Sequence, residues 1–170
     1  MEKMVIDNFN SVFKDTNTFI SGHTGFKGSW LAFWLNNLHS NVSGLSLEPE
    51  KDSHWNDLDI SIQNNNIGDI RNYNFVEECL LKANPEIVFH LAAQPLVRES
   101  YETPIETWET NVIGTANLLQ ACRKLDNLKS IIVITSDKCY ENIEINKGYK
   151  ESDPLGGHDP YSSSKAAVEF

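Results

Sequence analysis

The sequence lacks any run of about 18 or more apolar residues, so it contains no predicted membrane span. Positive charge is also scarce, since 14 Lys and Arg against 24 Asp and Glu give a formal net charge of −10. Proteins that bind nucleic acids usually carry a basic face, so no nucleic-acid partner is expected. The first residues lack a cationic stretch followed by an apolar block, and they do not resemble a secretory signal.

Cysteine is rare, with three residues and no Cys-x-x-Cys spacing. An odd number of unpaired thiols is typical of a reducing, cytoplasmic compartment. Cys139 follows a polar tract, but no histidine lies near it in the sequence, so we interpret it as a small buried hydrophobe rather than a nucleophile. The five histidines show no paired ligand spacing, and no metal site is predicted.

Strand-like and helix-like patterns alternate along the chain, which predicts an α/β fold with a doubly wound parallel sheet. We expect strands at 18–21, 41–47, 66–67, 86–91 and 129–135, and helices at 26–38, 72–83, 103–125 and from Pro160 onward. The helix at 26–38 is apolar on most sides, so it should be sandwiched between other elements or cover an interface. The apolar run 129–135 is typical of a strand buried on both faces.

A glycine-rich turn, Gly22-His23-Thr24-Gly25-Phe26-Lys27-Gly28, lies between the first predicted strand and helix. Glycines allow positive φ and close approach to a pyrophosphate, and a helix N-terminus favours an anion. The spacing of these glycines is one residue wider than the commonest dinucleotide fingerprint, so a plain strand-to-helix turn is an equal alternative. A phosphate-transfer loop needs its lysine after the last glycine, whereas Lys27 precedes Gly28.

Further candidates follow the other strands, because doubly wound sheets bind ligands beyond the carboxyl ends of their strands. Ser46 stands where an acidic residue would hold the adenosine ribose, and no arginine follows it for a 2′-phosphate, which favours NAD over NADP. Asp69 could cap the adenine amino group or be a solvated turn residue. Ala92 and Ala93 are small enough for a flat cofactor to lie close to the backbone.

Three other polar residues have ordinary structural interpretations. His90 lies inside an apolar strand and is expected to be a core histidine. Thr110 and Asn111 fall within the helix 103–125, where polar side chains usually face solvent or bond a backbone carbonyl four residues earlier.

A hydroxyl, an acid and a cation follow the last predicted strand as Ser136, Asp137 and Lys138. Tyr161 and Lys165 come later at i, i+4 spacing, so they share one face of a helix. An ammonium beside a phenol favours the phenolate, and the lowered pKa makes the tyrosine a usable general base. With Ser136 to hold the substrate hydroxyl, these residues predict a site that removes a proton from an alcohol.

Together these motifs resemble the extended short-chain dehydrogenase/reductase family of NAD-dependent epimerases and dehydratases. The likeness rests on strings at residues 22–31, 68–71, 90–98, 110–115, 135–142 and 153–165. The strings Gly-His-Thr-Gly-Phe-Lys-Gly-Ser-Trp and Thr-Ser-Asp-Lys are narrower and resemble the CDP-glucose 4,6-dehydratase branch. Lys138 and Ser46 stand where the dTDP-glucose branch has a glutamate and an aspartate.

The resemblance implies that residues 1–170 form an NAD-binding Rossmann domain that is incomplete, with a sugar-nucleotide-binding domain beyond it. It implies NAD as cofactor, CDP-glucose as substrate, a cytoplasmic place in deoxysugar (O-antigen) synthesis, and a homodimer paired through 104–125 and the helix from Pro160. Its cofactor-binding residues would be Gly22, His23, Thr24, Gly25, Phe26, Lys27, Gly28, Ser46, Asp69, Ile70, Leu91, Ala92, Ala93, Thr110, Tyr161 and Lys165. These 170 residues alone are expected to bind NAD weakly and to turn over no CDP-glucose.

The same resemblance implies the catalytic roles. Tyr161 would take the proton of the sugar O4 while C4 passes hydride to NAD, with Lys165 supporting the phenolate and Ser136 orienting O4. Asp137 would protonate the departing C6 hydroxyl, which requires burial to raise its pKa. Lys138 would be either the C5 base or a stabiliser of the enolate. Two alternatives stay open: a nucleotide-sugar epimerase of the same family, and a non-catalytic NAD-binding module.

Overall fold

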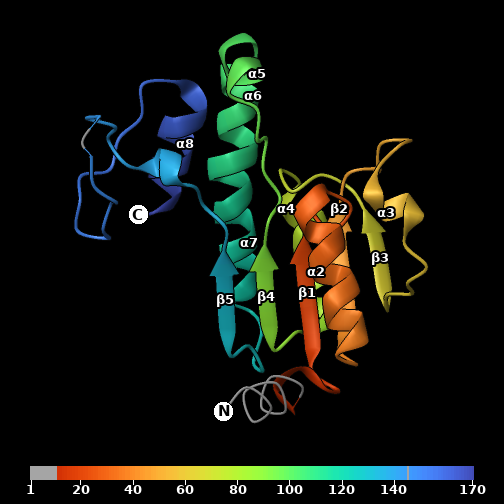
Figure 1. The fold of residues 1–170 in the computed structure, drawn as a ribbon. Helices are drawn as coiled ribbons and strands as arrows, with labels where there is room; N and C mark the ends of the chain where they lie inside the picture. Colours follow the sequence, from red (N-terminus) through yellow and green to blue (C-terminus); the bar gives the residue numbers. More distant parts are fainter. Residues whose placement is uncertain (1–10, 145) are drawn as a thin grey trace.

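The computed structural model describes residues 11–144 and 146–170 (Figure 1). The start of the chain, which does not resemble a secretory signal, lies outside the described residues. The centre of the fold is a sheet of five strands: β1 (Asn17–Ser21), β2 (Asn41–Ser46), β3 (Asn64–Ile67), β4 (Ile87–His90) and β5 (Ser130–Val133). All neighbours are parallel and the order is β3-β2-β1-β4-β5. The doubly wound α/β fold predicted from the sequence is therefore confirmed.

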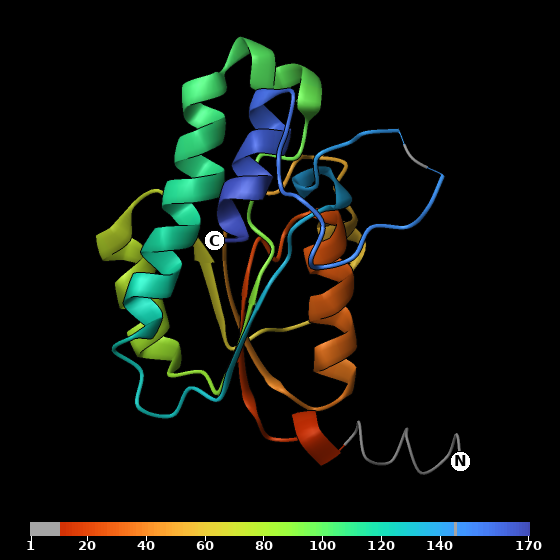
Figure 2. The ribbon, with the colours of Figure 1, turned by 90° about the vertical axis from the view of Figure 1, so that its left-hand side faces the viewer.

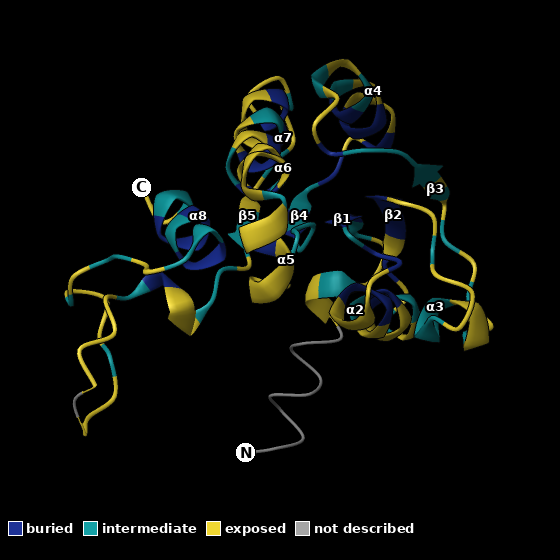
Figure 3. Cartoon of the chain, turned by 90° about the horizontal axis from the view of Figure 1, so that it is seen from above, coloured by how far each residue is buried: buried dark blue, intermediate teal, exposed yellow. Residues whose placement is uncertain are grey.

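Helices cover both faces of the sheet, which lies between them in Figures 2 and 3. The helices α2 (Phe26–Asn37) and α3 (His54–Asp57) lie on one face, and α4 (Tyr73–Ala83) and α7 (Gly114–Cys122) lie on the other. Successive side chains of a strand point to opposite faces. Strand β1 accordingly supplies both cores, with Phe19 in the cluster that includes Val76 and Leu118, and Ile20 in the cluster with Leu35.

The helix α2 corrects one prediction. Its buried positions are the small or apolar residues Gly28, Ser29, Ala32 and Leu35, which let the helix lie close to the sheet. Its aromatic side chains point outward, and Trp30 is 50% exposed. Of the two alternatives expected for this helix, a position between other elements is wrong for the described part of the chain, because small residues rather than aromatic ones form the buried face. The other alternative, that the helix covers an interface, stays a prediction.

Strand β5 pairs with β4 and is the last strand of the described part of the sheet. Its first residue is exposed and the other three are half-buried. The burial on both faces that the apolar run 129–135 predicts is therefore only partly present among residues 11–144 and 146–170.

The long helix predicted at 103–125 exists but is not a regular α-helix. It begins as α6 (Pro104–Trp108), passes through a π-helical turn, η1 (Glu109–Ile113), and continues as α7. A π-turn holds an extra residue and often marks a functional site. The short helix α5 (Val97–Glu102), which the sequence did not predict, precedes it. None of the helices among residues 11–144 and 146–170 is long and apolar enough to cross a bilayer.

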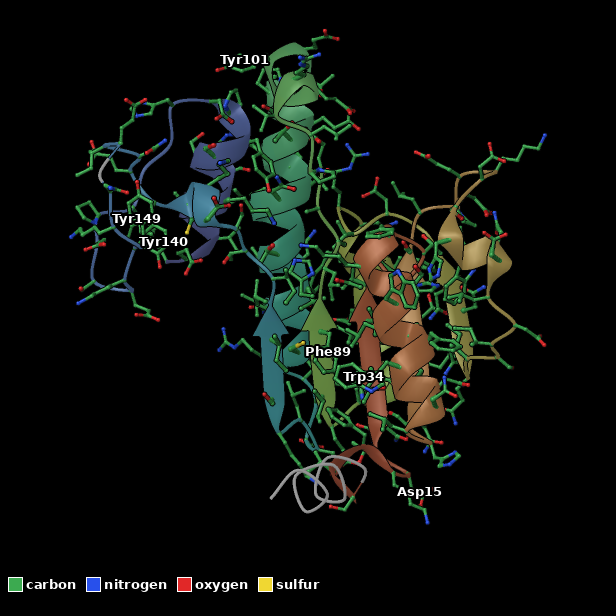
Figure 4. All side chains as sticks on the ribbon, in the orientation of Figure 1. Asp15, Trp34, Phe89, Tyr101, Tyr140 and Tyr149 are labelled. Atoms are coloured by element: carbon green, nitrogen blue, oxygen red, sulfur yellow. The ribbon has the colours of Figure 1, made fainter. Side chains whose placement is uncertain are left out.

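The C-terminal part lies beside the carboxyl end of β5. A short 3-10 turn, η2 (Asp137–Cys139), follows the strand, and the loop after it is fastened by stacking of Tyr140 on Tyr149, with ring centroids 5.1 Å apart (Figure 4). The predicted helix from Pro160 is α8 (Pro160–Val168). Proline occupies its first turn, and the Asp159 side chain caps it by accepting from the Ser162 amide at 2.8 Å.

Candidate functional site

The predicted site residues gather at one edge of the sheet. Because the five strands are parallel, their carboxyl ends point the same way. Gly22 follows β1, Ser46 ends β2, Asp69 follows β3, and the segment 91–93 follows β4. Residues 135–138 follow β5, so every strand contributes one candidate segment, and this edge is where ligands of doubly wound sheets bind.

The glycine turn is held at close range by its neighbours. Gly22 has φ +81°, and a Cβ on it would lie 2.8 Å from the Ala92 amide nitrogen. A Cβ on Gly28 would lie 1.9 Å from the Gly22 carbonyl oxygen. The turn therefore packs directly against the segment after β4 on one side and against α2 on the other, and larger residues do not fit at these two positions.

The N-terminus of α2 is open toward the same edge. Its N-cap, Gly25, contributes no side-chain hydrogen bond, and no acidic residue lies in the first turn. A helix start of this kind leaves amide N–H groups unpaired and carries a partial positive charge. Phe26 and Lys27 are exposed there. The arrangement suits an anion such as a pyrophosphate.

The side chains of the turn face the sheet rather than a ligand. His23 is fully buried, and its Nε2 lies 2.7 Å from the side-chain oxygen of Asn65. Burial lowers the pKa of His23, which the hydrogen bond to Asn65 partly opposes. The Thr24 hydroxyl donates to the Leu47 carbonyl at 3.0 Å and lies 2.6 Å from Ser46 Oγ. His23 and Thr24 can therefore offer a ligand their backbone, while Ser46 is tied to Thr24.

The segment after β3 is fixed by an ion-pair cluster. Both carboxylate oxygens of Asp69 accept from Arg71, with Nη2 at 2.6 Å from Oδ2, and this hydrogen bonding lowers the pKa of Asp69. Arg71 Nη1 also lies 3.3 Å from Glu106 Oε1 on α6. The side chain of Ile70 is buried against Gly114. Asp69 is thus a held carboxylate at the site edge, rather than a freely solvated turn residue.

The helix α8 brings Tyr161 and Lys165 to the end of β5. Both residues are buried, and the Lys165 Nζ donates to the Ile134 carbonyl at 3.2 Å. Burial lowers the pKa of Lys165, and the positive charge of Lys27 lowers it further. Lys27 belongs to the start of α2, so the positive charge of the glycine turn acts on Lys165 at the same sheet edge.

The tract Ser136-Asp137-Lys138 follows β5 and lies at the same edge of the sheet. Ser136 Oγ donates to Asp137 Oδ1 and accepts from the Lys138 amide, both at 3.1 Å. Asp137 and Lys138 form an ion pair at 3.5 Å, and their side chains are 78% and 56% exposed. The burial that the sequence argument required of Asp137 is therefore absent among residues 11–144 and 146–170.

Several residues that hold the site were missed. Asn111 is buried in η1, accepts from the Gln94 amide at 2.8 Å and donates to Ser164 Oγ at 2.9 Å. The Tyr161 amide donates to Ser100 Oγ. The interpretation of Asn111 as facing solvent or bonding a helix carbonyl is wrong, because the π-turn directs it inward. Thr110, beside it, is half-buried. The polar residues Glu109 and Thr110 directly precede Asn111, so the sequence gives no signal that this amide faces inward.

No group of His, Cys, Asp and Glu side chains in the described ranges is arranged to hold a metal ion. An organic cofactor could be held by the glycine turn, the start of α2 and the segments after β2, β3 and β4. Chemistry on a hydroxyl group could come from Tyr161, Lys165 and Ser136.

Comparison with known proteins agrees with this arrangement. The chain is 48% identical to CDP-glucose 4,6-dehydratase of Salmonella typhimurium over 154 residues. This matched region covers 89% of this chain and 43% of that protein. The chain is 37% identical over 117 residues to CDP-paratose 2-epimerase of Salmonella typhi, covering 60% and 35%. The solved structure of UDP-glucose 4-epimerase from Thermus thermophilus, a complex with NAD, superposes with a TM-score of 0.77 at 28% identity, covering 89% of this chain and 48% of that one.

The chain thus spans less than half the length of these relatives. The names of these relatives include one dehydratase and two epimerases, so the relatives do not agree on one reaction. Residues 19–170, nearly the whole described chain, match the family described as GDP-mannose 4,6 dehydratase. The chain belongs to the GDP-mannose 4,6-dehydratase family.

Proposed function

We propose that this chain is the cofactor-binding part of an NAD-dependent CDP-glucose 4,6-dehydratase, which converts CDP-glucose to CDP-4-dehydro-6-deoxyglucose and water. The observation that carries the proposal is the position of the buried Tyr161 and Lys165 at the carboxyl end of β5, the sheet edge that also carries the glycine turn. Lys165 donates to the Ile134 carbonyl, directly after that strand, at 3.2 Å. The choice of CDP-glucose rests on the 48% identity to the Salmonella typhimurium enzyme.

The site fits a dinucleotide on its own geometry. Gly22 and Gly28 let the turn pack tightly on the segment after β4 and on α2, whereas Gly25 is exposed and a Cβ there would have only the Gly22 carbonyl oxygen nearby, at 3.3 Å, so the backbone at Gly25 is open to a close ligand. The uncapped first turn of α2, with Lys27 beside it, would hold the pyrophosphate. Ser46 and Asp69 would hold the adenosine, and Ala92 and Ala93 would line the path of the cofactor. The chemistry that NAD supplies when bound is removal of a hydride at C4 of the sugar and its return at C6.

The chain's own residues would handle the protons. Tyr161 takes the proton of the O4 hydroxyl, and Ser136 Oγ orients that hydroxyl. Lys165 lies on the same helix face and stabilises the negative charge of the phenolate. Among the described residues, the Lys165 Nζ donates to the Ile134 carbonyl at 3.2 Å. An ammonium has three N–H donors, so another can reach the phenolate.

Loss of water would use the exposed pair after β5. Asp137 donates a proton to the departing C6 hydroxyl, and the bound sugar supplies the desolvation that such an acid requires. Lys138 stabilises the charge that develops on O4 when a base takes the C5 proton, and that base would be contributed by a residue other than Tyr161, Asp137 and Lys138. Its alternative role as the C5 base requires a neutral amine and therefore strong desolvation, whereas its side chain is 56% exposed.

The test is incubation of the protein, at the length of its relatives, with CDP-glucose and NAD. The expected product is a 4-keto sugar nucleotide lighter by one water, and Tyr161→Phe should abolish its formation. A product of unchanged mass would instead identify an epimerase, the reaction class of the Salmonella typhi relative. In Lys138→Met, undiminished exchange of the C5 hydrogen with solvent would remove Lys138 from the mechanism.

We further propose a homodimer paired through the long helix 104–125 and α8, in which the exposed face of α6 and η1 would take part. Ile105, Trp108 and Ile113 are 75%, 41% and 52% exposed there and line a shallow hollow with Pro104. Equilibrium sedimentation would test this, and a monomer at micromolar concentration would contradict it. A cytoplasmic location is proposed from the three free, buried thiols.

A further inference from the structure

A buried chain of hydrogen bonds runs through His90, at the carboxyl end of β4. The imidazole is 2% exposed. Its Nδ1 lies 2.6 Å from Ser21 Oγ at the end of β1, and its Nε2 lies 2.8 Å from Thr115 Oγ1 on α7. One side chain therefore joins two strand ends to the helix that covers them.

The positions of the protons follow from the partners. The Thr115 hydroxyl donates to the Asn111 carbonyl at 2.5 Å, because a carbonyl can only accept. Its oxygen must then accept from His90, which places the ring proton on Nε2. The unprotonated Nδ1 consequently accepts the Ser21 hydroxyl proton. Ser21 Oγ is free to accept the Leu91 and Ala92 amides, which lie 3.2 and 3.3 Å away.

This order of donors leaves no place for a second proton on the ring. Protonation of Nδ1 would set two donors against each other at Ser21, whose oxygen already faces the Leu91 and Ala92 amides. Burial lowers the pKa of His90 to about 4, and the charge of Lys165 acts in the same direction. The imidazole is thus neutral and confined to one tautomer over the physiological range.

The two ends of the chain of bonds reach the two halves of the site. At one end, the Ala92 amide lies directly against Gly22 of the glycine turn. At the other end, the backbone carbonyl of Asn111 accepts a hydrogen bond from the Thr115 hydroxyl. The Asn111 side chain accepts from the Gln94 amide and donates to Ser164 Oγ. Ser164 lies between Tyr161 and Lys165 on α8, so the bonds connect the cofactor edge to the proposed base.

We propose that His90 is a positioning residue whose single Nε2–H tautomer fixes α8, through Thr115 and Asn111, relative to the glycine turn. The proposal rests on the function proposed above for Tyr161 and Lys165, but its structural content is independent of the substrate. A core histidine that merely fills space would need neither a fixed tautomer nor both partners.

The test uses Thr115→Val, which keeps the shape of the side chain but removes the hydroxyl, with Thr115→Ser as the matched control. In the ¹⁵N-labelled chain, the nitrogen chemical shifts of the wild-type His90 ring should be those of the Nε2–H tautomer. The ring should not titrate between pH 5.5 and 8, a measurement range that lies above its pKa of about 4. In Thr115→Val the amide signals of Tyr161, Ser164 and Lys165 should shift, although none of them contacts Thr115. Thr115→Ser should retain the wild-type signals.

In the protein at the length of its relatives, Thr115→Val should lower kcat by about tenfold or more with little change in the Kd of NAD, since small misplacements of catalytic groups cost up to about a hundredfold. Thr115→Ser should restore kcat. If Thr115→Val fails to fold, Thr115→Ala removes the same hydroxyl without adding a methyl group at its place, and it should likewise release the tautomer and shift the α8 signals.

A His90 ring that carries its proton on Nδ1, or that titrates in this pH range, overturns the proposal. So do unshifted α8 signals or a wild-type kcat in Thr115→Val. If the wild-type protein shows no dehydratase activity, the proposed function fails, while the nitrogen and amide signals still decide whether His90 positions α8.

Discussion

Substitution of Gly28 by alanine should open the glycine turn. Gly28 is a buried residue in the first turn of α2, and an added Cβ would lie 1.9 Å from the Gly22 carbonyl oxygen and 2.9 Å from the His23 Cα. Both neighbours are backbone atoms, which cannot rotate away as a side chain can. Real Cβ atoms stay at least 3.0 Å from such neighbours, so α2 and the turn must separate by about 1 Å, the difference between 3.0 and 1.9 Å.

The expected cost follows from this displacement. Overpacking a tight contact destabilises a protein by about 1–3 kcal/mol, and a backbone clash belongs at the upper end of that range. The higher helix propensity of alanine stabilises the helix by up to about 1 kcal/mol relative to glycine, which offsets part of this cost. We therefore expect Gly28→Ala to lower the free energy of unfolding by about 2 kcal/mol. The same shift moves the amide groups that would face a pyrophosphate, so NAD affinity should fall as well.

The assay is urea unfolding of the chain, followed by fluorescence of its four tryptophans. Gly25→Ala is the matched control, because its added Cβ would lie 3.3 Å from the same Gly22 carbonyl oxygen and its φ is −72°. That variant loses only a favourable N-cap residue and should cost under about 1 kcal/mol. If Gly28→Ala were as stable as Gly25→Ala, the turn would be more adaptable than these contacts imply and the reasoning would fail.

Two further predictions concern ionisation. The buried His90 has a pKa of about 4 against 6.5 for a free histidine, so its contribution to stability is complete above pH 6.5 and is lost as the pH falls toward 4. The free energy of unfolding should decrease by about 2 kcal/mol between pH 7 and pH 5, with a smaller slope in His90→Gln, and a flat profile in urea titrations would contradict this. Burial raises the pKa of the Cys79 and Cys122 thiols to about 11, so the folded chain should react slowly with a disulfide reagent and the unfolded chain quickly. Rapid reaction of either thiol in the folded chain would contradict this prediction, because it would show that the residues that bury the thiol move away from it.

The sequence predicted what depends on local patterns. The alternation of apolar runs and amphipathic segments was enough for the strands and most helices, and the glycine spacing marked the turn after β1. The i, i+4 spacing of Tyr161 and Lys165 correctly placed both on one face of α8. Convergence at one sheet edge followed from parallel pairing alone.

What could not be predicted depends on partners far away in the chain. The burial of β5 depends on which elements lie beside it in space, and no feature of residues 130–133 encodes those neighbours. The exposure of Trp30 depends on the small residues of α2 facing the sheet. The inward direction of Asn111 depends on a π-turn, for which the residues around it carry no distinctive pattern.

The π-turn η1 also limits how the chain can change in length. It holds one residue more than a regular turn, so a single deletion between Glu109 and Ile113 would convert it to α-helix. The α-helical turns on either side would keep their register, because the residue removed is the extra one that the π-turn accommodates. The inward direction that this turn gives to the Asn111 side chain would be lost, so a shortened chain would keep the helix but lose the hydrogen bonds of Asn111 to Gln94 and Ser164.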